Sequence, residues 1–274
     1  MPDWPPLTNA NLISRLAMPN DEFAALALRL ARRIEPRTLT DEAFERALSY
    51  PWERPAESYW IEDGSVELLS GDARPAASGG RRWPLLAFGS NGAPGVLARK
   101  LSVLPEDDRD VLVLAGELTG YTVGPSAHLA LYGSLPATIE PLAAATERAA
   151  ILMVTAQQFE ALTLTEFNYR VVRLSGAPFV PDLDVPAPSG VLAYVSRWGV
   201  FDPGDGATGQ AELLDVAARM ILGPKSDARE LVARVFGDYA WSLETAAPVL
   251  AAHSRPFGGS SWEVFSSSRA ERMR

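Results

Sequence analysis

The 274-residue sequence contains no cysteine and only two histidines, His128 and His253. The absence of cysteine excludes disulfide bonds, thiolate ligands for a metal and a thiol nucleophile. Two histidines are too few for most zinc sites built from several imidazoles. We therefore expect no metal centre.

Basic residues are also scarce relative to acids, with 25 Lys and Arg against 34 Asp and Glu and a net charge of -9. Nucleic acids and anionic membranes are bound by clustered Lys and Arg, whereas the arginines here are scattered. We therefore expect neither partner. The sequence has no run of about 18 apolar residues and no basic, apolar leader at its start. These absences predict a cytoplasmic protein.

The pattern of residues changes twice along the chain. Apolar residues recur at helical spacing from Phe23 to Ile34, and a second short helix is expected after Thr40. The small, polar stretch at 71–82 is typical of an exposed connection, and strand-like runs follow it. The predicted units are a helical N-terminal extension (residues 1–75), a core domain (82–222) and a helical C-terminal extension (223–274).

The core domain alternates short apolar runs with turn-forming residues, as strands of a sheet do. The predicted strands are 85–88, 111–115, 129–132, 151–154, 169–174 and 191–196. Helices are expected over 93–104, 210–221 and 227–236. A further helix begins at Thr155-Ala-Gln-Gln158, which has the form of a capping box, and helical spacing places Glu166 at its end.

Two motifs suggest other chemistry and are rejected. Gly204-Asp-Gly206-Ala-Thr-Gly209 has the G-x-G-x-x-G form, but a second helix follows it where a dinucleotide site needs a strand ending in an acid. Ser90 and His128 lie on one predicted sheet, as in a serine hydrolase. Ser90, however, lacks the G-x-S-x-G elbow, and a lone histidine on an apolar strand is more often structural.

The most informative stretch is Leu85-Leu-Ala-Phe-Gly-Ser-Asn-Gly92, an apolar strand that ends in a Gly-Ser-Asn turn. Gly89 lets the main chain approach a ligand closely. The amides of Gly89, Ser90 and Asn91 can then point at an anion or a carbonyl oxygen. We expect a ligand pocket at this end of the strand.

Three further features follow in order: the phrase Leu135-Pro-Ala-Thr-Ile139, the capped helix ending at Glu166, and Tyr194 in a later strand. Over residues 83–221 this order resembles the gamma-glutamylcyclotransferase-like family, whose motifs are Tyr-Gly-Ser-Asn, an Ala-Thr-Ile strand and an acidic residue late in the following helix. The resemblance implies an α+β fold, a small mixed β-barrel with flanking helices, here carrying helical N- and C-terminal additions.

The resemblance also implies an activity, the release of 5-oxoproline from a gamma-glutamyl amine, peptide or natural-product intermediate without a metal or cofactor. Glu166 would be the general acid/base. The implied substrate-binding residues are Phe88, Gly89, Ser90, Asn91 and Tyr194. The sequence departs from the family at Phe88, which stands in place of the usual tyrosine, and at Gly92-Ala-Pro94, where leucine is commoner after the turn.

The alternative is a non-catalytic binding or interaction module on the same fold. An open cavity that reaches both Glu166 and the Gly89 turn would favour the enzyme. Side chains of the two extensions filling that cavity would favour the module.

Overall fold

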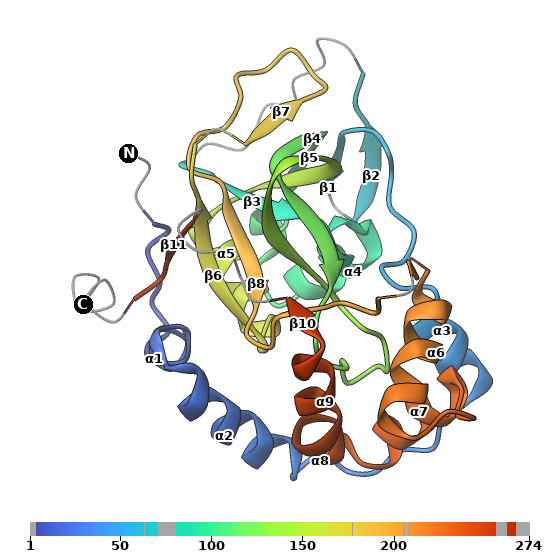
Figure 1. Ribbon diagram of the computed structural model, residues 1–274. Coiled ribbons are helices and arrows are strands. Elements are labelled where there is room, and N and C mark those ends of the chain that lie inside the picture. Colours follow the sequence, from blue (N-terminus) through green and yellow to red (C-terminus); the bar gives the residue numbers. More distant parts are fainter. Residues whose placement is uncertain are drawn as a thin grey trace.

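The computed structural model describes residues 4–62, 64–70, 80–176, 178–204, 206–207, 209–255 and 262–266. In this part of the chain nine strands form one mostly antiparallel sheet, and helices cover it and extend below it (Figure 1). The strands are β1 (Tyr59–Glu62), β2 (Ser65–Leu68), β3 (Trp83–Ala87), β4 (Val111–Pro125), β5 (Ala137–Val154), β6 (Tyr169–Leu174), β7 (Phe179–Pro181), β8 (Leu192–Ser196) and β11 (Trp262–Val264). The predicted α+β class is confirmed.

The strands follow the order β11-β6-β8-β3-β5-β4-β1-β2, with β7 paired to β4. The sheet is open, because its two end strands, β11 and β2, do not pair with each other within the described residues. The predicted closed barrel is therefore not observed. Two short strands, β9 (Val200–Phe201) and β10 (Ser254–Arg255), form a separate pair.

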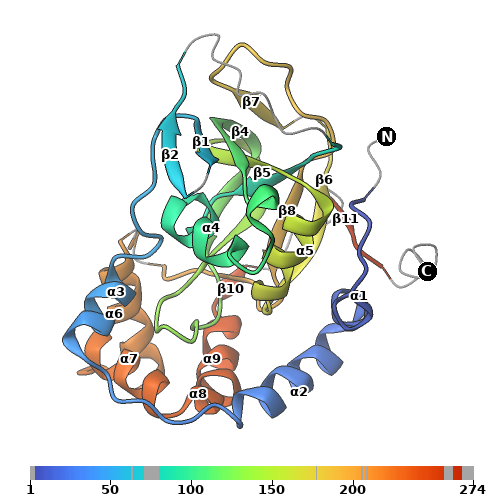
Figure 2. The ribbon, with the colours of Figure 1, turned by 180° about the vertical axis from the view of Figure 1, so that it is seen from behind.

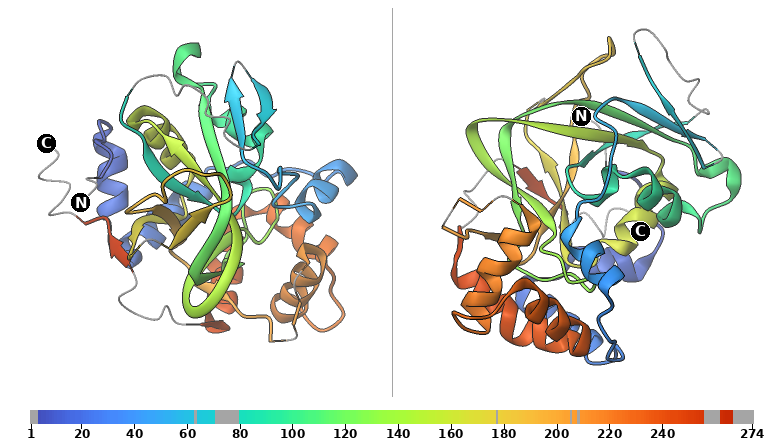
Figure 3. Two further views of the ribbon diagram at one scale, coloured as in Figure 1. Left: turned by 90° about the horizontal axis from the view of Figure 1, so that it is seen from above. Right: turned by 90° about the vertical axis from the view of Figure 1, so that its right-hand side faces the viewer.

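The longest strands of the sheet, β4 and β5, form an antiparallel ribbon that curves through the molecule in Figure 3. Its register runs from Leu112 opposite Met153 to Pro125 opposite Ala137, with an irregularity between Thr119 and Tyr121. Both strands are much longer than their apolar runs predicted. The middle of β5 is largely solvent-exposed and rich in alanine, so it lacks the alternation of apolar and polar residues that indicates a strand.

Helices α4 (Pro94–Leu101) and α5 (Ala156–Thr165) lie together on one side of the sheet, as Figure 2 shows. Proline occupies the first turn of α4, where its missing N–H costs nothing. The predicted capping box of α5 is confirmed: the Thr155 side chain accepts from the Gln158 amide, and the Gln158 side chain accepts from the Thr155 amide. The two helices share the buried core beneath β3.

The other helices come from both ends of the chain, and all except α1, whose apolar side chains join the core of the sheet, form a layer below it (Figure 1). Residues of α3, α6, α7 and α9 share one buried core, which also includes Leu129 and Leu135 from the β4–β5 connection. A smaller core joins α2 to the segment around Leu243. The helices are α1 (Ala10–Ala17), α2 (Asn20–Ala31), α3 (Asp41–Leu48), α6 (Gln210–Ile221), α7 (Ala228–Gly237), α8 (Tyr239–Trp241) and α9 (Ala247–Ala252), with a π-helical segment at Ser242–Ala246.

Several predicted elements differ from the structure. Residues 129–132 form a turn rather than a strand, because Ala130 and Ser134 bond across Gly133, which has a φ of 87°. The side chain of Leu129 instead packs into the core of the helical layer. Strands β1 and β2 lie in the extension predicted to be helical, and β10 and β11 lie in the C-terminal one.

The predicted connection at 71–82 lies outside the described residues up to position 79, and the G-x-G-x-x-G stretch is described only in part. Among the described helices, none has the length and apolar character needed to cross a bilayer.

Candidate active site

Glu166 is the residue at which α5 ends. It is the C-cap of the helix, with non-helical backbone angles of φ -89° and ψ 56°. The Arg15 guanidinium of α1 donates to the last carbonyls of α5, at 2.6 Å to Thr163 O and 3.3 Å to Leu164 O. A cation at this place also opposes the partial negative charge of the helix terminus. The N-terminal extension therefore fixes the segment that carries Glu166.

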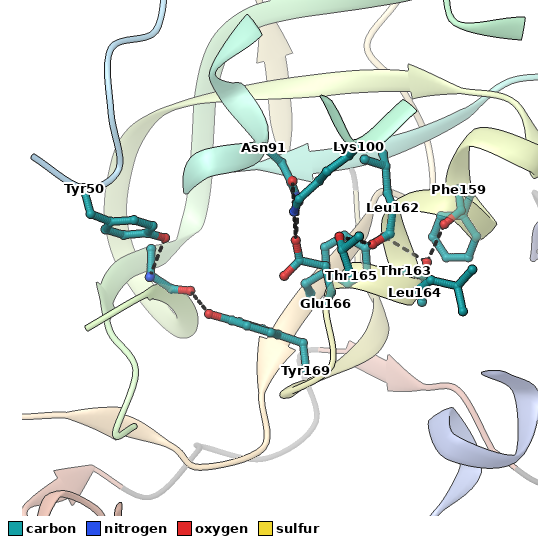
Figure 4. Close-up of polar contacts among 12 residues, drawn as sticks. Tyr50, Asn91, Lys100, Phe159, Leu162, Thr163, Leu164, Thr165, Glu166 and Tyr169 are labelled. Atoms are coloured by element: carbon teal, nitrogen blue, oxygen red, sulfur yellow. Dashed lines mark hydrogen bonds and ion pairs between the residues drawn. The ribbon is translucent and has the colours of Figure 1, made fainter. Parts of the chain in front are cut away.

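One carboxylate oxygen of Glu166 is held by two donors (Figure 4). Lys100 Nζ lies 2.5 Å from Oε1, and Asn91 Nδ2 donates to the same oxygen at 3.0 Å. Lys100 also donates to Asn91 Oδ1 at 2.8 Å, which closes a triangle of side chains. The Lys100 and Glu166 side chains are only 13% and 14% exposed. Water therefore screens this ion pair weakly.

The second oxygen of Glu166, Oε2, accepts no hydrogen bond from any described residue. In Figure 4 it is turned toward Tyr50 and Tyr169, away from Lys100. The carboxylate is thus oriented through Oε1 and open at Oε2. This arrangement suits a group that exchanges a proton with a bound molecule.

The charge of Glu166 acts on four buried tyrosine hydroxyls. Burial raises the pKa of each, and the negative charge of Glu166 raises each further. They stay protonated at physiological pH and can donate hydrogen bonds. The four are Tyr50, Tyr132, Tyr169 and Tyr194.

The predicted Gly-Ser-Asn turn lies directly beside Glu166. Ser90, Asn91 and Gly92 form a single 3-10 turn after β3. The side chain of Asn91 is the part of the turn that reaches Glu166. A Cβ atom on Gly89 would lie 2.6 Å from the Tyr50 hydroxyl oxygen, so the close approach that only glycine permits is made by a residue of this chain.

Tyr50 covers part of the expected amide cradle. Its hydroxyl accepts a hydrogen bond from Ala137 N at 2.8 Å, and the backbone of Ser90 also bonds to it. On the other side, the Tyr169 hydroxyl donates to Ala137 O at 2.9 Å (Figure 4). Tyr50, a residue of the N-terminal extension, therefore occupies the backbone of Ser90, one of the three residues whose amides we expected a ligand to use.

Two cavities meet at this site. The smaller, of about 30 Å³, lies against the turn and has room for about one water molecule. Its walls bring together all the predicted site residues, namely Phe88, Gly89, Ser90, Asn91, Glu166 and Tyr194. Tyr194 is buried there, and its hydroxyl is hydrogen bonded to Thr163 Oγ1 at 2.9 Å.

The larger cavity, of about 400 Å³, opens beside Glu166 and Ser90 and lies between the sheet and the helical layer. Its volume is in the range of small-molecule sites. Apolar side chains of α2 form one wall, and aromatic side chains form much of the rest. The aromatic lining residues are Tyr50, Trp52, His128, Tyr132, Phe167, Tyr169 and Tyr239. Residues of both extensions thus form walls of this larger cavity.

His128 contributes to the wall of this cavity as a neutral imidazole. Its Nδ1 is 2.6 Å from Ser126 Oγ, which is in turn 2.6 Å from Ser196 Oγ. Burial lowers the pKa of His128 to about 3. The partner of the ring is the buried Ser126, not Ser90, and no carboxylate of the described residues bonds to it. The Ser90 and His128 pair therefore has no hydrolase geometry.

Sequence reasoning missed Lys100 and Tyr50. Lys100 is one of two basic residues in the last turn of α4, a place where cations are common, so its sequence position carries no functional signal. Tyr50 is distant in sequence from the Gly-Ser-Asn turn, and only the folded chain brings them together. Within the described residues, no cluster of three or more His, Asp or Glu side chains could hold a metal ion.

Comparison with known proteins adds little. No family model matches the chain, and no curated protein does. Among solved structures, the solution structure of At5g39720.1 from Arabidopsis thaliana is similar over 56% of this chain and 99% of its own, with 18% sequence identity and a TM-score of 0.35. A similarity of this size is too low to define the fold or the function of this protein.

Proposed function

We propose that this protein is a gamma-glutamylcyclotransferase-type enzyme that releases 5-oxoproline from a gamma-glutamyl amide. One observation carries the proposal: Glu166 is held through Oε1 by Lys100 and Asn91, while Oε2 is open beside a cavity of about 400 Å³. The larger cavity also reaches Ser90 of the turn. We also propose that the core domain, residues 82–222, is the barrel-type unit of that family.

The reaction needs no protein nucleophile. The α-amine of the substrate attacks its own γ-carbonyl carbon, closes a five-membered lactam and expels an amine. Glu166 accepts the proton from the attacking nitrogen and returns it to the leaving nitrogen. Binding the substrate in a folded conformer supplies part of the rate, because the two reacting groups are then already adjacent.

Lys100 and Asn91 support this role as positioning residues. Because both bond to Oε1, they limit rotation of the carboxylate and direct Oε2 to the cavity. The Phe88–Asn91 turn and Tyr194 line the recess next to Glu166 and would contact the glutamyl part of the substrate. The larger aromatic cavity is the place for the amine part.

A binding module is the second candidate, and Tyr50 is the observation that favours it. Its hydroxyl already bonds to the backbone of Ser90 and leaves a recess of only about 30 Å³ against the turn. In such a module the aromatic cavity would bind a ligand without converting it to a product. Binding of gamma-glutamyl compounds with no product would favour this candidate.

The test is to incubate the wild type, Glu166→Gln and Glu106→Gln with a set of gamma-glutamyl amides and peptides, and to follow 5-oxoproline by mass spectrometry. Glu106 is an exposed acid of a short 3-10 turn and serves as the matched control. We expect release by the wild type and the control, and loss of release in Glu166→Gln. Release that survives in Glu166→Gln would keep the reaction and exclude Glu166 as its acid/base. No release by any protein would contradict the proposal.

A further inference from the structure

The N-terminal extension supplies a fixed hydroxyl to the proposed active site. The ring of Tyr50 is stacked on Tyr132, with centroids 6.1 Å apart, and meets Trp52 edge-on at 5.5 Å. These contacts hold its hydroxyl against Ala137 N and the backbone of Ser90. Tyr50 also lines both cavities.

The hydrogen bonds of Tyr50 leave its proton available. A phenol accepts two hydrogen bonds and donates one. Two main-chain groups, at Ala137 and Ser90, take the acceptor positions, and no described residue accepts the proton. Hydrogen bonds accepted by a hydroxyl polarise its O–H bond and make it a stronger donor. Burial and the charge of Glu166 raise the pKa of Tyr50, so the proton is retained at physiological pH.

We propose that the Tyr50 hydroxyl is the oxyanion donor of this site and transmits the polarisation of two main-chain amides to the γ-carbonyl oxygen of the substrate. This inference rests on the proposed function. As the N–C bond forms, the carbonyl π electrons move onto oxygen, and Tyr50 donates a hydrogen bond to that oxyanion. Glu166 transfers the proton from the attacking to the leaving nitrogen. The C=O bond re-forms, the bond to the amine breaks, and 5-oxoproline and the amine leave.

The test compares the steady-state kinetics of the wild type, Tyr50→Phe and Tyr121→Phe on a gamma-glutamyl amide that the wild type cleaves. Tyr121 is a buried phenol stacked on Trp262 and is the matched control. We expect Tyr50→Phe to lower kcat by roughly 10²–10³-fold, the usual effect of losing one oxyanion donor. KM should change by no more than about threefold, because the interaction forms in the transition state.

A second variant separates this role from a structural one. Fluorotyrosine at position 50 keeps the shape of the ring and has a more acidic hydroxyl, so kcat should equal or exceed that of the wild type. This comparison also decides the matter if Tyr50→Phe does not fold. A fluorotyrosine enzyme with much lower kcat would overturn the inference.

The remaining outcomes distinguish the two proposals. If the wild type releases 5-oxoproline and Tyr50→Phe keeps the wild-type kcat, Tyr50 is not the donor and the proposed function stands. If Tyr50→Phe raises kcat, the hydroxyl obstructs the amides and the inference is wrong. If the wild type releases no 5-oxoproline, the proposed function fails and this inference fails with it.

Discussion

The ion pair between Lys100 and Glu166 gives the sharpest test of how the site is built. In Lys100→Met the carboxylate of Glu166 keeps its bond from Asn91 but loses its charged partner, at 2.5 Å, in a place that is 14% exposed. Hydrogen bonds to charged groups contribute about 1.5–3 kcal/mol. We therefore expect Lys100→Met to lower the free energy of unfolding by roughly 2 kcal/mol. Thermal or urea unfolding measures this loss.

A double-mutant cycle then isolates the pair. Glu166→Gln removes the charge that Lys100→Met leaves without a counter-ion, so the double variant should be more stable than the sum of the single effects predicts, by about 1–2 kcal/mol. Lys225→Met, at an exposed lysine, is the control and should change stability by less than about 0.5 kcal/mol. Additive effects of the two single changes would refute the coupling that the geometry implies.

Three further predictions follow from individual contacts. Arg15→Met removes two hydrogen bonds to the end of α5, and we expect the urea midpoint to fall by an amount equivalent to about 1–2 kcal/mol; an unchanged midpoint would show that the arginine does not hold the helix. Gly89→Ala places a Cβ atom 2.6 Å from the Tyr50 hydroxyl and should destabilise the protein by about 1–3 kcal/mol. Adding Tyr50→Phe removes the clashing oxygen, and a double variant no more stable than Gly89→Ala would contradict this explanation. Burial lowers the pKa of His128 from 6.5 to about 3. Below pH 6.5 the unfolded chain therefore binds a proton that the folded protein does not, and the free energy of unfolding falls as the pH drops. Between about pH 7 and pH 5 the wild type should lose about 2 kcal/mol more of this free energy than His128→Asn, and equal losses would mean that the ring is not buried neutral.

The sequence predicted those parts of the fold that depend on local patterns. The bounds of β6 and α6 agree with their apolar periodicity, and the capping box of α5 places Glu166 at the end of the helix as expected. The strand at 129–132 was predicted wrongly, because its most buried apolar residue, Leu129, packs against helices distant in sequence instead of in a sheet. An apolar run shows that a segment is buried but not which partner buries it.

The candidate site was only partly predictable for the same reason. The turn at Gly89 and the acid at Glu166 carry recognisable local signals, and the fold brings them to one cavity. Lys100 and Tyr50 have no such signal, since their importance comes from contacts made across the chain. The aromatic cavity likewise depends on how both extensions meet the sheet, which no local pattern describes.

The measurement that tests the central claim most directly is kcat/KM for 5-oxoproline release from a gamma-glutamyl amide by the wild type and by Glu166→Gln. If Glu166 transfers the proton, the ratio of the two values should be about 10²–10⁴, the usual contribution of a general acid/base. A ratio near one, with clear release by both proteins, would contradict the assignment of Glu166.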